Sequence, residues 1–191
     1  MASFPFTSFP YLETERLSLG PLLETDEKEI FLLRSDASVN EFLDRPRAST
    51  LKEAGDFIQK IQKGVRNHES LFWAIRLKTE PALIGTICLW NPSPKEKRAE
   101  IGYELLPQHQ RRGYMQEALN CVIRYGFGAA QLKTIEAWLR AKNLKSIKIL
   151  ENSNFKRDLH AEARMSPDEK QQGMIVYSLT NGSPTNPPRH E

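Results

Sequence analysis

Alternating apolar and polar residues, the pattern typical of β-strands, dominate the middle of the chain. Residues 71–77 and 82–90 are rich in aromatic and β-branched side chains. Residues 98–106 alternate so that Glu100, Gly102 and Glu104 share one face of a third strand. Further strands are expected at residues 16–19 and 134–139, and a final hairpin at residues 155–164 and 174–179.

Apolar residues at helical spacing predict four helices. The first helix is expected to begin at Thr25-Asp26, which suits an N-cap. The second is expected to begin at Ser49-Thr50, where Glu53 completes a capping box, and to end near Gly64. The other two are expected at residues 113–127 and 144–150.

Together these elements predict one α+β domain around a largely antiparallel sheet. The 191 residues have the length of a single domain, and no internal repeat or linker divides them. We expect the domain to span residues 1–180. Residues 181–191 are rich in Gly, Ser and Pro, which predicts a disordered tail.

Composition excludes several classes of partner. A net charge of +3 is too small for a nucleic-acid-binding surface, although it suits an anionic small ligand if the cations gather in one place. The chain has no run of about 18 apolar residues that would span a membrane. Its first residues lack the cationic flank and long apolar core of a secretory signal, so we expect a cytoplasmic location.

The cysteines and histidines do not indicate a metal site. Cys88 and Cys121 each lie within an apolar stretch and are expected to be buried free thiols. The four histidines are scattered, and no metal-ligand spacing occurs. We therefore expect no metal cofactor.

The turn that leads from residues 98–106 into the helix at 113–127 is the most informative segment. A helix N-terminus carries unpaired N–H groups and partial positive charge, both of which attract phosphate. Gly113 lets an anion approach the backbone closely, and Arg111 and Arg112 add charge. The segment predicts a diphosphate site, the alternative being a plain strand–helix connection. Walker-type and dinucleotide glycine patterns are absent.

Two motifs then resemble a known family. Gln110-x-x-Gly113-x-Met115 is similar to the Gln/Arg-x-x-Gly-x-Gly/Ala signature of the GNAT acetyltransferases. Residues 99–103 (AEIGY) and 113–118 (GYMQEA) resemble the branch of ribosomal-protein alanine N-acetyltransferases. Residues 136–139, 143–146 (NLKS) and 150–155 resemble its later strand, helix start and "Gly-Phe" close, and the likeness spans residues 13–179. Met115, Arg111 and Asn154 depart from the usual residues.

The resemblance implies a mixed, mostly antiparallel twisted sheet, flanked by helices and with a splayed central strand pair. It also implies acetyl-CoA as co-substrate, with the pantetheine arm between the strands at 98–106 and 134–139. The residues implied in binding it are Leu105, Leu106, Gln110, Arg111, Arg112, Gly113, Tyr114, Met115, Asn143 and Ser146. Backbone groups of Leu105 and Leu106 are expected to pair with the arm, and an N–H group there to polarise the thioester.

Three side chains are candidates for proton transfer. Ser146 matches the serine of the branch's Asn-x-x-Ser and is expected to protonate or solvate the leaving thiolate; a hydroxyl that binds a helix-start amide is the alternative. Glu100 and Glu104 share a strand face and are candidates to draw the amine's proton through water, the alternative being solvated surface carboxylates. Where the ribosomal enzymes place a catalytic Glu, this chain has Met165, and Glu162 is out of register.

The pKa of the acceptor bounds its class. At neutral pH an α-amine is neutral roughly 300-fold more often than a lysine amine, an advantage of about 3.5 kcal/mol. We therefore expect a primary amine, preferably a protein or peptide N-terminus, attacking in a ternary complex. A polyamine, aminoglycoside or amino-acid derivative is the alternative acceptor, and a CoA-binding sensor the non-catalytic alternative. The oligomeric state stays open, a homodimer being among the alternatives.

Overall fold

The computed structural model describes residues 3–182, and these form one eight-stranded sheet in the order β1-β2-β3-β4-β5-β6-β8-β7. All neighbouring strands are antiparallel except β5 and β6. The strands are β1 (Leu12–Glu13), β2 (Leu17–Pro21), β3 (Leu71–Leu77), β4 (Leu83–Ser93), β5 (Arg98–Leu105), β6 (Thr134–Arg140), β7 (Lys156–Arg157) and β8 (Met174–Thr180). The sheet is thus mixed and mostly antiparallel, as expected.

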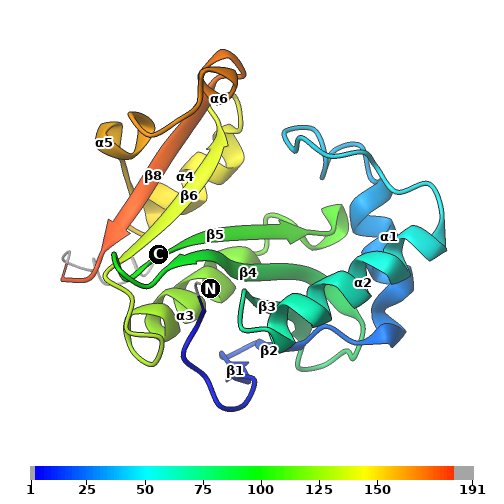
Figure 1. Ribbon diagram of the computed structural model, residues 1–191. Coiled ribbons are helices and arrows are strands. Elements are labelled where there is room, and N and C mark those ends of the chain that lie inside the picture. Colours follow the sequence, from blue (N-terminus) through cyan, green and yellow to red (C-terminus); the bar gives the residue numbers. More distant parts are fainter. Residues whose placement is uncertain (1–2, 183–191) are drawn as a thin grey trace.

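The parallel pair β5 and β6 stays together only briefly. Their pairing covers Arg98–Glu100 and Thr134–Glu136, after which the strands separate, as Figure 1 shows. β6 continues along β8 over its whole length, whereas β5 continues along β4 as far as Leu105. The two halves of the sheet therefore diverge from one point, and this confirms the splayed central pair.

Helices cover both faces of the sheet. On one face lie α1 (Glu27–Ser35) and α2 (Leu51–Arg66), and on the other α3 (Tyr114–Phe127) and α4 (Leu144–Asn152). Alternation along β3 explains this division. Ala74 packs in a cluster with α1 and α2, whereas Trp73 and Ile75 belong to the larger core that includes α3.

The start of α2 shows how local sequence sets a boundary. The side chain of Thr50 accepts a hydrogen bond from the backbone N–H of Glu53, and the Glu53 carboxylate accepts one from the N–H of Ser49. The expected Thr50 cap is thus confirmed, whereas the Glu53 carboxylate binds the N–H one residue before the N-cap and so completes the capping box only in part. Gly64 does not end the helix, which continues to Arg66.

The start of α1 differs from the expected N-cap. A 3-10 turn, η1 (Glu24–Asp26), precedes the helix, and the Asp26 carboxylate does not cap α1. Instead it accepts hydrogen bonds from the N–H of Leu23 and from Arg76 of β3. A second 3-10 turn, η2 (Pro107–His109), follows β5.

The prediction of a strand over residues 155–164 was wrong for most of that range. Only β7 is extended, and α5 (Leu159–Glu162) and α6 (Pro167–Gln171) follow it before β8. Asp158 caps α5 by accepting from the N–H of Ala161, and Ser166 begins a capping box on α6. These polar caps outweigh the weak alternation of the segment. β7 still pairs with β8, so the final hairpin exists in shortened form.

Two further predictions concern the C-terminal tail and membrane-spanning segments. Asn181 and Gly182 form a turn after β8, and the rest of the expected tail lies outside the described residues. Between residues 3 and 182 no helix is long and apolar enough to cross a lipid bilayer.

Candidate active site

The first turn of α3 lies directly after a glycine-centred turn. Gly113 precedes the helix with φ of 77°, a left-handed conformation that glycine adopts without cost. The first three helical residues, Tyr114, Met115 and Gln116, have N–H groups without an intrahelical partner. These donors and the helix dipole make this turn suited to a diphosphate.

Arg16 of the segment before β2 fixes this turn from the side. Its guanidinium donates to the backbone oxygen of Arg112 at 2.9 Å and to the Glu117 carboxylate at 2.6 Å, and it lies 4.7 Å from the centre of the Tyr114 ring. Burial opposes ionisation of Glu117, but hydrogen bonds from Thr14 and Arg16 outweigh it and hold the pKa of Glu117 below its usual value. No local pattern predicts this contact, because Arg16 and Glu117 lie 101 residues apart.

The other expected phosphate-loop residues have distinct positions. Arg111 and Arg112 are exposed, and Arg111 also has a positive φ of 63°. Gln110 donates its side-chain amide to the Leu105 oxygen at 2.9 Å, so it closes the loop onto β5. Met115 is buried and packs in the core rather than lining the turn.

Leu105 and Leu106 present their backbone groups in opposite directions. The Leu106 N–H donates to the Ile84 oxygen at 2.9 Å and is therefore already engaged with β4. Successive residues of a strand alternate in direction, so the N–H of Leu105 points away from β4 and toward the separation between β5 and β6. Of the two expected backbone partners, Leu105 is the one left to face a ligand.

Asn143 and Ser146 lie together at the start of α4. The Asn143 side-chain oxygen accepts from the Ser146 N–H at 3.1 Å, so Asn143 caps the helix. Ser146 is half-buried, and its backbone oxygen accepts from the Tyr103 hydroxyl of β5 at 3.3 Å. Asn143 thus supplies the cap on the Ser146 N–H, and the role of the Ser146 hydroxyl stays a prediction. Burial raises the pKa of Tyr103 above its usual value, so that phenol stays protonated.

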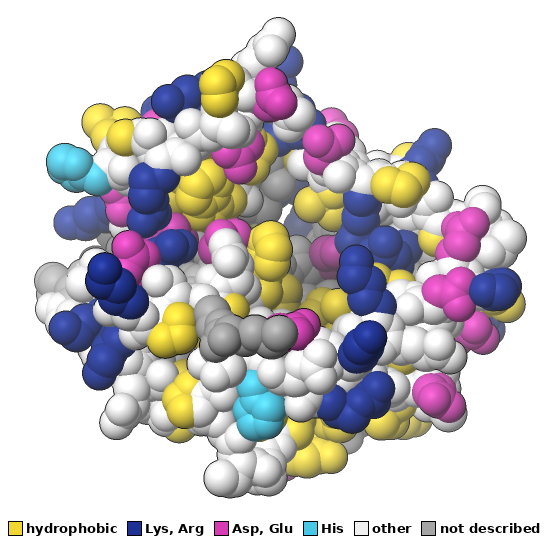
Figure 2. Space-filling model, viewed as in Figure 1, with side chains coloured by type: hydrophobic (Ala, Val, Ile, Leu, Met, Phe, Trp, Pro, Cys, Tyr) yellow, Lys and Arg dark blue, Asp and Glu magenta, His cyan; other side chains and the backbone are white. Residues whose placement is uncertain are grey.

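The opposite face of the separating strands borders a cavity of about 860 Å³. It is lined by side chains from segment 36–50, α2, strands β3 to β6, β8 and the α5–α6 region. Figure 2 shows this side of the molecule hollowed between the part that carries β6 and β8 and the part that carries α1. Its size is that of a small-molecule pocket.

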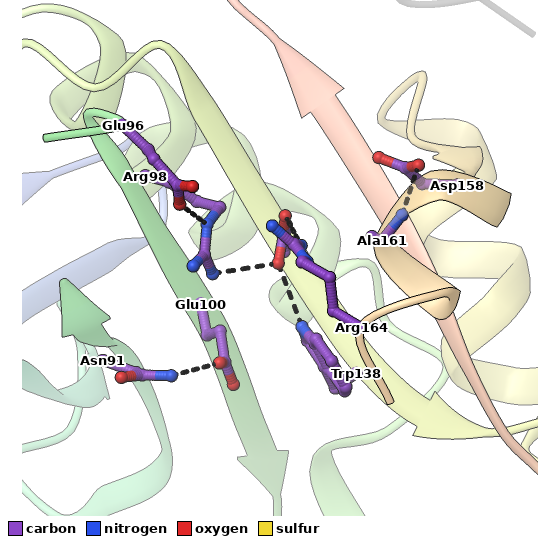
Figure 3. A network of polar contacts seen from close by, with 9 residues as sticks. Asn91, Glu96, Arg98, Glu100, Trp138, Asp158, Ala161 and Arg164 are labelled. Atoms are coloured by element: carbon purple, nitrogen blue, oxygen red, sulfur yellow. Dashed lines mark hydrogen bonds and ion pairs between the residues drawn. The ribbon is translucent and has the colours of Figure 1, made fainter. Parts of the chain in front are cut away.

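Glu100 lies on this cavity at the last paired position of β5, directly opposite Glu136 of β6. It is only 7 % exposed, and one carboxylate oxygen accepts from the Asn91 amide at 2.5 Å (Figure 3). Burial raises the pKa of Glu100; the hydrogen bond from Asn91 lowers it, and the charge of Glu136 raises it again. The result is a partly desolvated carboxylate with a pKa above the usual value.

Glu104 also borders the cavity, but it is already paired. Both its oxygens accept from the Arg45 guanidinium at 2.7 Å, in the bidentate geometry that makes such pairs strong. Arg45 also donates to Asn40, whose amide is buried against the end of α1. Sequence spacing could not indicate the pair, since Arg45 lies in a segment without periodicity.

Glu136, which sequence reasoning did not single out, is the centre of a polar network. Arg98 and Arg164 both pair with its carboxylate, at 3.1 and 2.5 Å, and the Trp138 indole donates to it at 3.1 Å. Figure 3 shows Arg98 on β5 and Arg164 beyond Trp138, so the network ties the two strands and the α5–α6 connection together. Its only sequence signal was an acid in an otherwise apolar strand.

Other reactive side chains are paired, buried or not activated. Glu162 pairs with Arg157 at 2.8 Å, and Met165 is buried. Burial raises the pKa of the Cys88 thiol to about 12 and raises that of Cys121 as well. Both cysteines are free and remain protonated, so neither is an activated nucleophile.

Comparisons with known proteins identify the family. The family model described as an acetyltransferase (GNAT) domain matches residues 16–156. The uncharacterized N-acetyltransferase YoaA of Bacillus subtilis (strain 168) is 32 % identical over 171 residues, covering 90 % of this chain and 97 % of YoaA. The uncharacterized N-acetyltransferase p20 of Bacillus licheniformis is 31 % identical over 166 residues, covering 86 % and 90 %.

Solved structures share the fold at lower identity. RimL, a ribosomal L7/L12 alpha-N-protein acetyltransferase solved with coenzyme A, has a TM-score of 0.75 at 16 % identity, covering 90 % of this chain and 98 % of RimL. The microcin C7 self-immunity acetyltransferase MccE, solved with acetyl-CoA and AMP, has a TM-score of 0.72 at 20 % identity, covering 87 % and 93 %. The chain therefore belongs to the GNAT family and is an acetyl-CoA-dependent N-acetyltransferase.

Proposed function

We propose that this enzyme transfers the acetyl group of acetyl-CoA to a primary amine, preferably the α-amine of a protein or peptide N-terminus, by direct attack in a ternary complex. The observation that carries the proposal is the position of Glu100. It lies where β5 and β6 separate, on the face that borders the cavity and opposite the face covered by α3 and α4. A buried carboxylate at this point suits the transfer of a proton from the amine.

The binding of acetyl-CoA is assigned to the other side of the separation. The N–H groups of the first turn of α3 would hold the diphosphate, with Arg111 and Arg112 adding charge. The Leu105 N–H faces the gap between the strands, where it is available to the pantetheine arm or the thioester oxygen. The Asn143 side-chain nitrogen remains free to donate, because only its oxygen caps α4.

In the reaction the amine nitrogen attacks the thioester carbonyl, so that a C–N bond forms and the C–S bond breaks. Glu100 takes the proton lost by the nitrogen, directly or through water. Burial raises its pKa, which makes Glu100 a stronger base than a fully solvated carboxylate. Ser146 is the candidate to give the departing thiolate a proton or a hydrogen bond, and a proton from solvent then restores its hydroxyl.

Glu104 has a different role in this proposal. Because Arg45 occupies both its oxygens, Glu104 anchors segment 36–50 as a wall of the cavity rather than receiving the proton. With Glu104 paired, Glu100 is left to act alone as the base. A site with a single carboxylate base suits an amine of low pKa, which supports an N-terminal α-amine over a lysine side chain.

Thiol release with acetyl-CoA and peptide pairs tests the proposal. One peptide has a free N-terminus and no lysine; the other is N-terminally blocked and contains lysine. We expect the first to react faster, and Glu100→Gln to lower kcat about 100-fold or more, with Glu41→Gln, an exposed acid outside the cavity, as control. Faster reaction of the blocked peptide would contradict the preference for N-termini. Tight CoA binding with no turnover on any amine would support the sensor alternative.

A further inference from the structure

The charges that line the cavity are mostly committed to one another. Glu104 is held by Arg45, and the adjoining Glu136 is held by Arg98 and Arg164. Glu104 and Glu136 therefore have little capacity left for a substrate cation. Glu169 accepts from the backbone N–H and hydroxyl of Ser166, both through one carboxylate oxygen, in the capping box of α6.

Three acids of the cavity form no ion pair within residues 3–182. Asp44 is exposed and Glu169 is partly exposed to water, where an ion pair contributes little. Glu100 is buried, its hydrogen bond comes from the uncharged Asn91, and within residues 3–182 it forms no ion pair. The cavity therefore offers one desolvated position for one ammonium group.

The rest of the cavity wall is apolar and partly uncovered. Trp90 is 50 % exposed and Leu43 is 38 % exposed, although both are large hydrophobic residues. Trp90 lies directly across from Glu100 on the neighbouring strand, and Phe72 and Trp138 also line the cavity. Figure 2 shows hydrophobic side chains within the hollow beside acidic and basic ones. Exposed apolar surface next to a buried acid indicates a ligand that combines an apolar body with one positive charge.

We propose that the acceptor is a primary amine with a single positive charge and an apolar, preferably aromatic, body that packs against Trp90 while its amine lies at Glu100. This inference rests on the proposed function and names the acceptor class of the same site. An N-terminus that begins with an aromatic residue and a free arylalkylamine share this chemistry.

Polyamines and aminoglycosides fit the cavity poorly for the same reason. Beside Glu100, a second ammonium group would lose water without gaining another buried carboxylate, or would have to displace Arg45 from Glu104. Asp44 and Glu169, which also line the cavity, are exposed and partly exposed to water, so pairing with them contributes little. Either event costs more free energy than an exposed ion pair contributes. The mixture of acids in the cavity thus does not make it a polycation site.

Steady-state kinetics with a matched amine series tests the inference. The free amines are 2-phenylethylamine, ethylamine and a 2-phenylethylamine with a second aminomethyl group on its ring. The peptides are tripeptide amides that differ only in N-terminal Phe, Gly or Lys, and they show which source of the amine is preferred. We expect kcat/KM for the aromatic monoamine to exceed that of the other two about tenfold or more, in whichever series reacts faster.

Trp90→Ala should remove the aromatic advantage and leave ethylamine or the Gly peptide nearly unchanged, and Trp90→Phe should restore much of it. Leu159→Ala is the matched control, because Leu159 is 68 % exposed but lies outside the cavity. Faster reaction of the dications, or an equal loss for every amine in Trp90→Ala, overturns the inference and leaves acetyl transfer standing. No turnover with any amine would overturn the proposed function and this inference together.

Discussion

At the scale of single residues, the site depends on how each carboxylate is surrounded. Glu100, Glu104 and Glu136 have the same side chain and lie close together, yet one accepts a neutral amide, one a single guanidinium and one two guanidinium groups. Alternation along residues 98–106 predicted that Glu100 and Glu104 share a face, and the structure confirms it. Their different partners come from Asn91 and Arg45, which no local pattern connects to them.

The hydrogen bond from Asn91 opposes the rise in the pKa of Glu100 that burial causes, so removing Asn91 should change the pH profile. Asn91 has a positive φ of 47°, so Asn91→Gly removes the amide without straining the backbone. The lost hydrogen bond had lowered the pKa of Glu100, so that pKa rises further. Activity needs the ionised carboxylate, so the acid limb of kcat/KM should move to higher pH, while the rate at high pH changes little. An acid limb that stays in place would show that Glu100 is not the group that titrates.

Glu117 should make the stability of the fold depend on pH. Its folded pKa is lowered below the ordinary value of 4.5, so its ion pair stabilises the fold fully above that value and is lost as pH falls through the folded pKa. Glu117→Gln should lower the free energy of unfolding by about 1–2 kcal/mol at neutral pH. Urea denaturation should show this difference shrinking toward acid pH, and a difference that is constant across pH would contradict the assignment.

At the scale of elements, the sequence predicted those strands and helices whose formation depends on local periodicity and capping. Periodicity predicted the strands at 71–77 and 98–105 and the long helix after Gly113. The capping residue Thr50 predicted the start of α2. The segment at 155–164 failed because capping side chains, rather than alternation, decide it. Segment 36–50 had no period to analyse, although it forms a wall of the cavity.

Breaking the Arg45–Glu104 ion pair should weaken the discrimination between singly and doubly charged amines. Arg45→Met keeps the apolar stem but leaves Glu104 without its guanidinium, so a second substrate ammonium gains a partner. We expect the kcat/KM of a dication relative to the matching monoamine to rise about tenfold, equivalent to about 1.4 kcal/mol. Adding Glu104→Gln should return the ratio to its original value. If Arg45→Met alone left the ratio unchanged, Glu104 would not be the reason that dications are excluded.

At the scale of the whole molecule, function depends on one interruption in a continuous sheet. β5 and β6 pair over only three positions and then separate, with α3 on one side of the sheet and the cavity on the other. No sequence period encodes such a separation, because it depends on β6 following β8 while β5 follows β4. Resemblance to GNAT enzymes predicted it, whereas the pattern of residues alone predicted only an α+β sheet.

The binding of acetyl-CoA at the start of α3 can be isolated with a pair of glycines. Gly113 and Gly173 both have positive φ, 77° and 70°, so Ala at either position adds similar backbone strain of about 1–2 kcal/mol. A Cβ at Gly113 would lie 3.2 Å from the Arg16 guanidinium at the proposed diphosphate site, whereas a Cβ at Gly173 meets nothing within 4 Å. The two variants therefore separate loss of ligand binding from loss of stability.

Calorimetric titration of coenzyme A into the unsubstituted protein, Gly113→Ala and Gly173→Ala is the decisive measurement. We expect Gly113→Ala to raise the Kd for coenzyme A at least about tenfold, and Gly173→Ala to leave it within about twofold of the original. Equal affinity in all three proteins would place the cofactor elsewhere and contradict the acyl-transfer geometry derived from this helix.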